Sequence, residues 1–206
     1  IAILLIDKLG RRPLLGLGLT GIAVCMLTLA YGFGSATYTL TEAAVSTLPP
    51  AIEQSQLGGI IDMTFNSDIE FKQALSSALG DEALQNHESA LITAAISMNS
   101  TLVLVGVLGF VASFAISIGP VMWVLFSELF PNRIRGLAIS FVGLINSAVS
   151  FTVQLVFPWQ LSSLGSATTF LIYGLFAILG LVIVMRLLPE TKGKTLEELQ
   201  SLLVRT

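Results

Sequence analysis

Four long apolar runs constrain this chain more than any other feature of its sequence. Each is about the 20 residues that an α-helix needs to cross the hydrocarbon core of a bilayer. The runs are Leu14–Phe33, Thr101–Phe126, Leu137–Phe157 and Thr168–Leu188, and the opening run, Ile1–Ile6, has the character of the end of a further span. Because lipid offers no hydrogen bonds to the backbone, such runs fold as helices. We expect an all-α, polytopic membrane protein.

The amino-acid composition also indicates that most of the chain is surrounded by lipid. Hydrophobic residues make up 54% of the chain and charged residues 11%, whereas about a quarter of the residues of soluble proteins are charged. A net charge of −3, without basic clusters interleaved with aromatics, argues against a nucleic-acid partner. The single cysteine, Cys25, is expected to be a small buried side chain, and there is no Cys/His spacing for a metal. Motifs of hydrolases and metalloproteases are absent, so we expect neither an enzyme nor a cofactor.

The basic residues predict an orientation for the spans. When the chain is threaded back and forth through the four runs, every Lys and Arg except Lys72 falls on one side. Membrane proteins concentrate these residues on the cytoplasmic side, so we expect that side, and with it the C-terminus, to be cytoplasmic. Lys72 lies in the outer segment among these acidic residues: Glu42, Glu53, Asp62, Asp68, Glu70, Asp81, Glu82 and Glu88.

This threading divides the chain into four segments. Residues 1–34 hold the end of one helix, a cytoplasmic loop and the first complete span. Residues 35–99 form an extracytoplasmic, partly helical acidic insertion, residues 100–188 hold the other three spans, and residues 189–206 form a cytoplasmic tail. Connections longer than about 15 residues usually have structure or a function of their own. We expect the insertion to pack on its own apolar stripe as an outer cap; a lid or a partner-docking surface is the alternative.

Helix signals within the insertion are clear. Ser67 and Glu70 have the spacing of a capping box, apolar residues follow at helical spacing, and Gly80 can end the helix. The pattern predicts a helix over residues 68–79. A second helix is expected over residues 82–98, and residues 41–59 are expected to be irregular.

Polar residues in the third span indicate a helix that faces protein or water rather than lipid. Small and hydrogen-bonding side chains recur there every three or four residues: Ser140, Gly143, Ser147, Ser150 and Gln154, with Asn146 beside them. Stripes of Ser and Gly also pack helices together, and we favour packing for Ser140, Gly143 and Ser147. An amide offers donors and an acceptor that suit a neutral polyhydroxyl ligand, so Asn146 is a candidate ligand contact.

The second span carries a similar stripe and a proline. Its small residues are Gly106, Gly109, Ser113 and Ser117, and Pro120 follows. Because Pro120 lacks an N–H and its ring clashes one turn back, we expect a kink or break there. Broken helices in transporters often line a binding site. Trp123, one turn on, could equally belong to an interfacial aromatic belt. The first and fourth spans are almost uniformly apolar, so we expect them to face lipid.

Charged clusters stand at the predicted cytoplasmic helix ends. They are Asp7, Lys8, Arg11 and Arg12; Glu128, Arg133 and Arg135; and Glu190, Lys192 and Lys194. One interpretation is an ion-pair network that joins helix ends and can be broken and remade. The alternative, that the bases only set orientation, does not explain the three acids.

In these clusters the chain resembles the sugar porter family of the major facilitator superfamily. The matching motifs, in order, are Asp7–Arg12 as D-x-x-G-R-R, Gly119–Trp123 with Ser127–Pro131 and Arg135-Gly136, and Pro189–Gly193. The likeness is closest to bacterial proton-coupled pentose and hexose symporters. It implies the C-terminal half of that fold, from the end of helix 8 through helix 12, with the N-terminal half of the same protein upstream.

The resemblance also implies roles for particular residues. Gly119, Trp123, Asn146 and Ser150 are the expected substrate-binding set, although Ser147 stands where the family often has Trp. The expected cytoplasmic gate is Asp7, Arg11, Arg12, Glu128, Arg135 and Glu190. No ionisable residue lies deep in the four spans, so a proton-carrying residue is expected upstream.

The implied function is alternating-access transport of a monosaccharide through a bacterial inner membrane, with proton symport in the intact protein. The partners would then be a sugar, protons and the lipid bilayer. The alternatives are a carrier of a polyol or another neutral solute, and a transporter-like sugar sensor. A sensor would need a longer cytoplasmic extension than the tail after Gly193.

Overall fold

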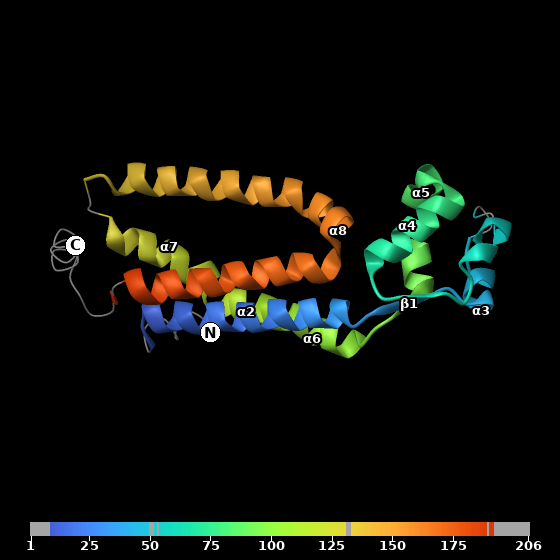
Figure 1. The fold of residues 1–206 in the computed structure, drawn as a ribbon. Helices are drawn as coiled ribbons and strands as arrows, with labels where there is room; N and C mark the ends of the chain where they lie inside the picture. The colour runs from blue at the N-terminus through green and yellow to red at the C-terminus, as the bar shows by residue number, and fades with distance from the viewer. Residues whose placement is uncertain (1–8, 50–51, 53, 131–132, 189, 192–206) are drawn as a thin grey trace. The chain divides into compact units, whose positions relative to one another are not determined.

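A computed structural model describes residues 9–49, 52, 54–130, 133–188 and 190–191 of the chain (Figure 1). Within them, three helical stretches are long and apolar enough to cross a membrane. These are α2 (Arg11–Gly34), α6 (Ser100–Ile116) continued by α7 (Ile118–Leu129), and α8 (Arg135–Leu187). The predicted helical membrane fold is confirmed. Asp7 lies outside the described residues.

Helix α8 contains two of the predicted spans. Its backbone leaves the helical region at Gly165, where φ is 78° and ψ is 165°. A positive φ with extended ψ is open to glycine and strained for other residues. The two arms that meet there run in opposite directions (Figure 1).

The predicted break in the second span is also present. Helix α6 ends at Ile116 and α7 begins at Ile118, with the intervening Ser117 at φ −119° and ψ −86°. Pro120 therefore lies in the first turn of α7, where its missing N–H leaves no gap in a helical ladder.

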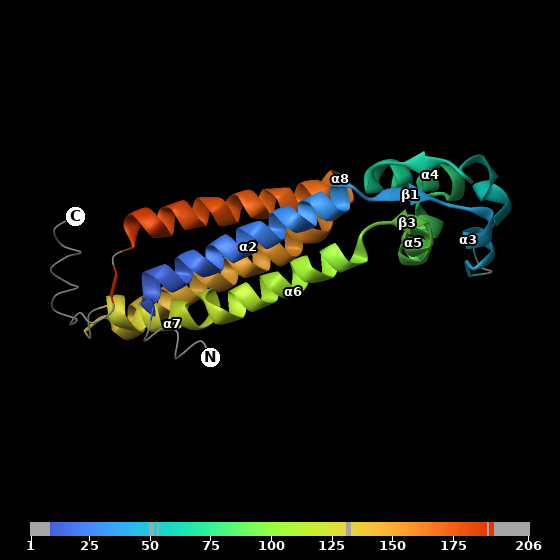
Figure 2. The ribbon, with the colours of Figure 1, turned by 90° about the horizontal axis from the view of Figure 1, so that it is seen from below.

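Helix α2, as far as Leu27, packs closely in the compact unit made by the described parts of Ile1–Leu27, Val105–Pro158 and Ile172–Thr206. On one side, its small residues lie against the small residues of α6 and against Ser117 at the break after α6. The pairs are Gly18–Ser117, Gly21–Ser113 and Cys25–Gly109. On the other side it contacts the second arm of α8, through Gly16–Met185 and Leu27–Gly174 (Figure 2). Of the apolar window of α2, 44% is buried, against 6% for α8. The first span, which we expect to face lipid, therefore also packs on neighbouring helices, because its glycines let them approach.

A second compact unit consists of Thr28–Leu104 and Trp159–Leu171. The described residues of the insertion all belong to it. They form short helices α3 (Glu42–Ser46) and η1 (Gln54–Gly59), longer helices α4 (Asp68–Leu79) and α5 (Asp81–Ala95), and strands β1 (Thr37–Thr39), β2 (Thr64–Phe65) and β3 (Ile96–Ser97). The strands form an antiparallel sheet in the order β2-β1-β3. Tyr38, Leu57, Phe71, Leu75 and Leu91 are among its fully or almost fully buried side chains. The insertion therefore packs on its own apolar residues.

The helix predicted over residues 68–79 is confirmed with the same bounds. The Ser67 hydroxyl accepts a hydrogen bond from the Ile69 N–H at 3.2 Å, and Gly80 ends the helix with a φ of 80°. The second predicted helix ends earlier, at Ala95, because the next two residues pair with β1. The sheet was not predicted, since strands of two or three residues are too short to show alternation.

Tyr38 provides a test of this core. Its ring stacks on Phe71, with ring centroids 5.5 Å apart, and burial, assisted by the charge of Asp68, raises the pKa of Tyr38 to about 12. The unfolded-state pKa is about 10, so this group contributes stability below pH 10 that is lost as pH rises towards 12. Tyr38→Phe should therefore flatten the alkaline decline of the thermal unfolding midpoint, measured between pH 9 and 11.5. Identical pH slopes for variant and wild type would contradict the burial of a neutral phenol.

Candidate functional site

Charged residues from three separate segments meet at the beginning of α2. Arg11 Nη2 lies 2.6 Å from Glu128 Oε1 near the end of α7. The other oxygen of Glu128 accepts a hydrogen bond from the Thr191 hydroxyl at 2.7 Å. Glu190, after α8, accepts hydrogen bonds from the backbone N–H groups of Arg11 and Arg12, each at 3.1 Å. We call Arg11, Arg12, Glu128, Glu190 and Thr191 the ionic cluster.

Glu190 caps the N-terminus of α2, although it lies far from that helix in the sequence. The first N–H groups of a helix have no partner within it, and the helix dipole favours an anion at that end. Gly10, immediately before α2, has a φ of 92°, and a Cβ there would lie 2.9 Å from Glu190 Oε2. Glycine at this position therefore provides both the backbone turn and the room for the carboxylate.

The guanidinium of Arg12 donates to the carbonyl oxygen of Met185 near the end of α8. With Glu190 and Thr191, this contact joins the start of α2 to the end of α8. Sequence reasoning singled out Arg12 and Glu190 but missed Thr191, although Thr191 directly follows Glu190 in the third motif.

Arg135 lies elsewhere in the structure. Its Nε donates to the carbonyl oxygen of Phe130 at 3.2 Å, where Phe130 is the residue that ends α7. Among the described contacts it does not reach Arg11, Glu128 or Glu190. The geometry therefore brings together four of the six residues expected at the gate, places Arg135 at the turn between α7 and α8, and leaves Asp7 outside the described residues.

The four expected substrate contacts lie on α7 and the first arm of α8. Trp123 is 52% exposed and stands edge-on to Phe126, with centroids 6.2 Å apart. Asn146 and Ser150 are exposed. Within the described residues no recorded contact joins the four. An amide at membrane depth that makes no recorded hydrogen bond to the chain is available to water, another segment or a ligand.

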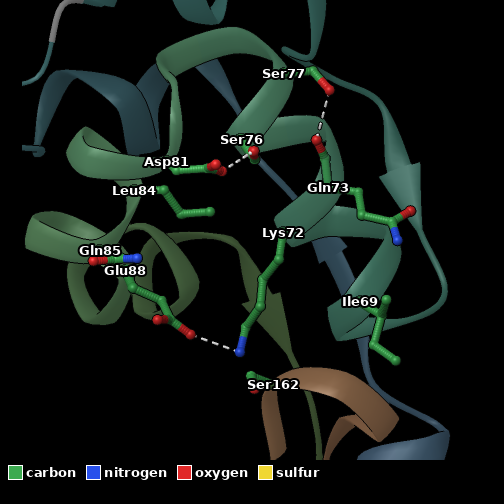
Figure 3. Close-up of a pocket in the computed structure, with 10 residues that line it drawn as sticks. All are labelled: Ile69, Lys72, Gln73, Ser76, Ser77, Asp81, Leu84, Gln85, Glu88 and Ser162. Carbon is green, nitrogen blue, oxygen red and sulfur yellow. Dashed lines mark hydrogen bonds and ion pairs between the residues drawn. The ribbon is translucent and has the colours of Figure 1, made fainter. Parts of the chain in front are cut away.

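The insertion has a hollow of about 550 Å³ between α4 and α5 (Figure 3). The polar groups there pair with one another: Lys72 Nζ lies 2.6 Å from Glu88 Oε1, and the Ser76 hydroxyl bonds Asp81. The amides of Gln73 and Gln85 lie on opposite sides of it and do not converge (Figure 3). A charge pair and a hydrogen bond therefore join α4 and α5 along this hollow.

Comparison with known proteins gives the family. A family model described as "Sugar (and other) transporter" matches residues 1–48 and 83–203. The chain belongs to the sugar porter family of the major facilitator superfamily. Members of this family are transporters and not enzymes. The residues left out by the family model, 49–82, include α4 and most of the first half of the insertion.

Curated sugar porters match along nearly the whole chain. The facilitated glucose transporter member 10 of solute carrier family 2 from Xenopus tropicalis is 31% identical over 226 residues, which cover 97% of this chain and 40% of that protein. The D-xylose-proton symporter of Escherichia coli is 30% identical over 208 residues, which cover 98% of this chain and 30% of the symporter. This chain therefore spans less than half the length of these sugar porters.

Solved structures show the same fold. An inward-open structure of the xylose transporter XylE from E. coli has a TM-score of 0.61 and 28% identity, and the match covers 98% of this chain and 31% of XylE. XylE bound to 6-bromo-6-deoxy-D-glucose has a TM-score of 0.58 and 29% identity with the same coverage. The fold of this chain is thus part of the major facilitator fold.

Proposed function

We propose that this chain supplies the C-terminal helices of an alternating-access carrier for a monosaccharide, a pentose or a hexose. The observation that carries the proposal is the ionic cluster, in which Glu190 and Glu128 join three helix ends within the residues that the sugar-transporter family model matches. Relatives named as a glucose transporter and a xylose symporter support the substrate class.

The ionic cluster is suited to a latch. Its central pair, Arg11 and Glu128, is partly exposed, at 16% and 23% of the side chains. Such a pair contributes modestly, since water competes for both charges, and it can separate at a small cost. In a carrier that rocks two halves about a central site, the cluster would hold the cytoplasmic ends together and part when the site opens inward.

The substrate is proposed to be neutral. The polar groups on the expected substrate-facing helices are an amide, hydroxyls and an indole, and no basic residue lies from Ser100 to Ser127 or from Gly136 to Met185. An anion would need a cation or a group of donors to replace its hydration. A polyol is the second candidate, because it offers the same hydroxyl groups as a sugar.

Proton symport is proposed from the named symporter relative. The helices of this chain contain no Asp, Glu, Lys, Arg or His from Pro13 to Gly34, or in the two stretches given above. The proton-carrying residue is therefore assigned to a part of the carrier outside these helices. Proteoliposomes that contain no sugar at the start are given labelled xylose or glucose, with and without an imposed pH gradient. Sugar accumulation that requires the gradient indicates symport, and equal uptake in both conditions indicates facilitated diffusion.

The setting is proposed to be a bacterial inner membrane, with the ionic cluster and the C-terminus on the cytoplasmic side. The charge bias of the sequence supports this orientation.

Trp123→Ala tests the substrate assignment. In proteoliposomes containing the full-length protein, we expect uptake of labelled xylose or glucose to fall about tenfold, because the loss of an aromatic contact of about 1.4 kcal/mol weakens sugar binding by that factor. Trp159→Ala is the matched control, because Trp159 is similarly exposed, at 60%, but lies outside the substrate-binding set. Normal uptake by Trp123→Ala at equal protein levels would remove Trp123 from the site.

A further inference from the structure

A carboxylate of the insertion caps a membrane helix that lies 98 residues further along the chain. Asp68, the first residue of α4, accepts two hydrogen bonds at Oδ2 from Ser166, one from the backbone N–H at 2.8 Å and one from the hydroxyl at 3.0 Å. Ser166 begins the second arm of α8. The residue before it, Gly165, has no side chain with which to cap that helix, so Asp68 provides the cap.

The turn at Gly165 is built around this carboxylate. A Cβ on Gly165 would lie 2.6 Å from Asp68 Oδ1, and the positive φ of Gly165 already favours glycine. Thr169, which is fully buried, donates its hydroxyl to the Gly165 carbonyl at 2.7 Å. The turn therefore holds one backbone geometry, which directs the N–H of Ser166 at Asp68.

Electrostatics favours the same arrangement. Asp68 lies at the beginning of α4, whose N-cap is Ser67, and also at the beginning of the second arm of α8. Each helix start carries a partial positive charge, so one carboxylate is stabilised by two helix ends. Further contacts lie close by: Phe33 stacks on Phe170 with centroids 5.3 Å apart, and Ser162 borders the hollow into which Lys72 points (Figure 3).

We propose that Asp68 fastens the insertion to the turn of α8, so that α4 and residues 159–171 move as one body. The insertion then stays fixed to this turn and does not hinge independently of it. Asp68 is a positioning residue in this scheme, and the proposal does not depend on which solute is carried.

Hydrogen exchange of the full-length protein in lipid nanodiscs tests the fastening. In Asp68→Ala, the backbone amides of residues 166–169 are expected to exchange about tenfold faster than in the wild type, because the Ser166 N–H loses its acceptor and the helix loses its cap. Glu70→Ala is the matched control: it also removes an acid from the first turn of α4, but Glu70 is exposed. Unchanged exchange at residues 166–169 in Asp68→Ala overturns the proposal.

A second variant covers the case in which Asp68→Ala loosens the whole insertion. Gly165→Ala leaves α4 intact and crowds Asp68 from the other side. Faster exchange confined to residues 166–169 and the first turn of α4 supports the fastening, and unchanged exchange there overturns it.

Motion is measured separately with spin labels. Labels at the exposed positions Ser77 on α4 and Ser163 on α8, introduced on a background without reactive cysteines, report the distance between the insertion and the turn. One narrow distance distribution, unchanged by saturating xylose or glucose and broadened in Asp68→Ala, is expected. A broad wild-type distribution, or one that shifts with sugar, identifies a hinged lid instead.

Discussion

Gly18→Ala is expected to lower the thermal unfolding midpoint of the protein in detergent by several degrees, through a loss of about 1–3 kcal/mol. A Cβ at this position would collide with both Oγ and Cβ of Ser117 and lie 3.2 Å from the carbonyl oxygen of Ser113. Rotating one hydroxyl cannot relieve a clash with Cβ, so α2 and α6 must move apart. Association of membrane helices depends on close van der Waals contact, which this separation reduces.

Two further variants make this prediction specific. Gly18→Ala combined with Ser117→Gly should recover most of the lost stability, because the second change removes both clashing atoms and glycine tolerates the backbone at Ser117. Gly143→Ala is the control, since no atom lies within 4 Å of its added Cβ. If Gly18→Ala is as stable as Gly143→Ala, the close packing of α2 on α6 is wrong.

On the proposal that the ionic cluster is a cytoplasmic latch, Glu190→Ala is expected to open this latch and to shift the carrier towards its inward-open state. The change leaves the N–H groups of Arg11 and Arg12 without their acceptor and removes an anion from the start of α2. Loss of charged hydrogen bonds of this kind costs about 1.5–3 kcal/mol each. Glu128→Gln should act in the same direction but more weakly, because the amide still accepts a hydrogen bond from Thr191.

The shift is measured by labelling. A cysteine introduced at Ser150, treated with an impermeant maleimide from the cytoplasmic side, should react several times faster in Glu190→Ala than in the unmodified background. Gly10→Ala should do the same, since its Cβ would crowd the Glu190 carboxylate. Glu82→Gln, an exposed acid of the insertion, is the control. Equal labelling rates in all four proteins would exclude a latch at Glu190.

Several features could be predicted from the sequence because they depend on local physics. Burial in lipid requires about 20 apolar residues in succession, so the four spans are visible without any knowledge of their neighbours. The break at Ser117 lies one turn before Pro120, whose ring does not fit the interior of a continuous helix. The bounds of α4 follow from Ser67 and Gly80, each of which acts within one turn. The charged residues of the motifs could be identified as candidate gate residues because their positions at the ends of the spans can be read from the sequence.

What each of these residues contacts was decided by tertiary structure alone. Apolar composition cannot distinguish a helix facing lipid from one packed on others, and the burial of α2 depends on Gly18 meeting Ser117, far along the chain. The same holds for Glu190, which caps α2 across nearly the whole length of the sequence, and for Asp68, which caps α8. A helix start carries unpaired N–H groups whatever the sequence, but the carboxylate that reaches them is chosen by the fold.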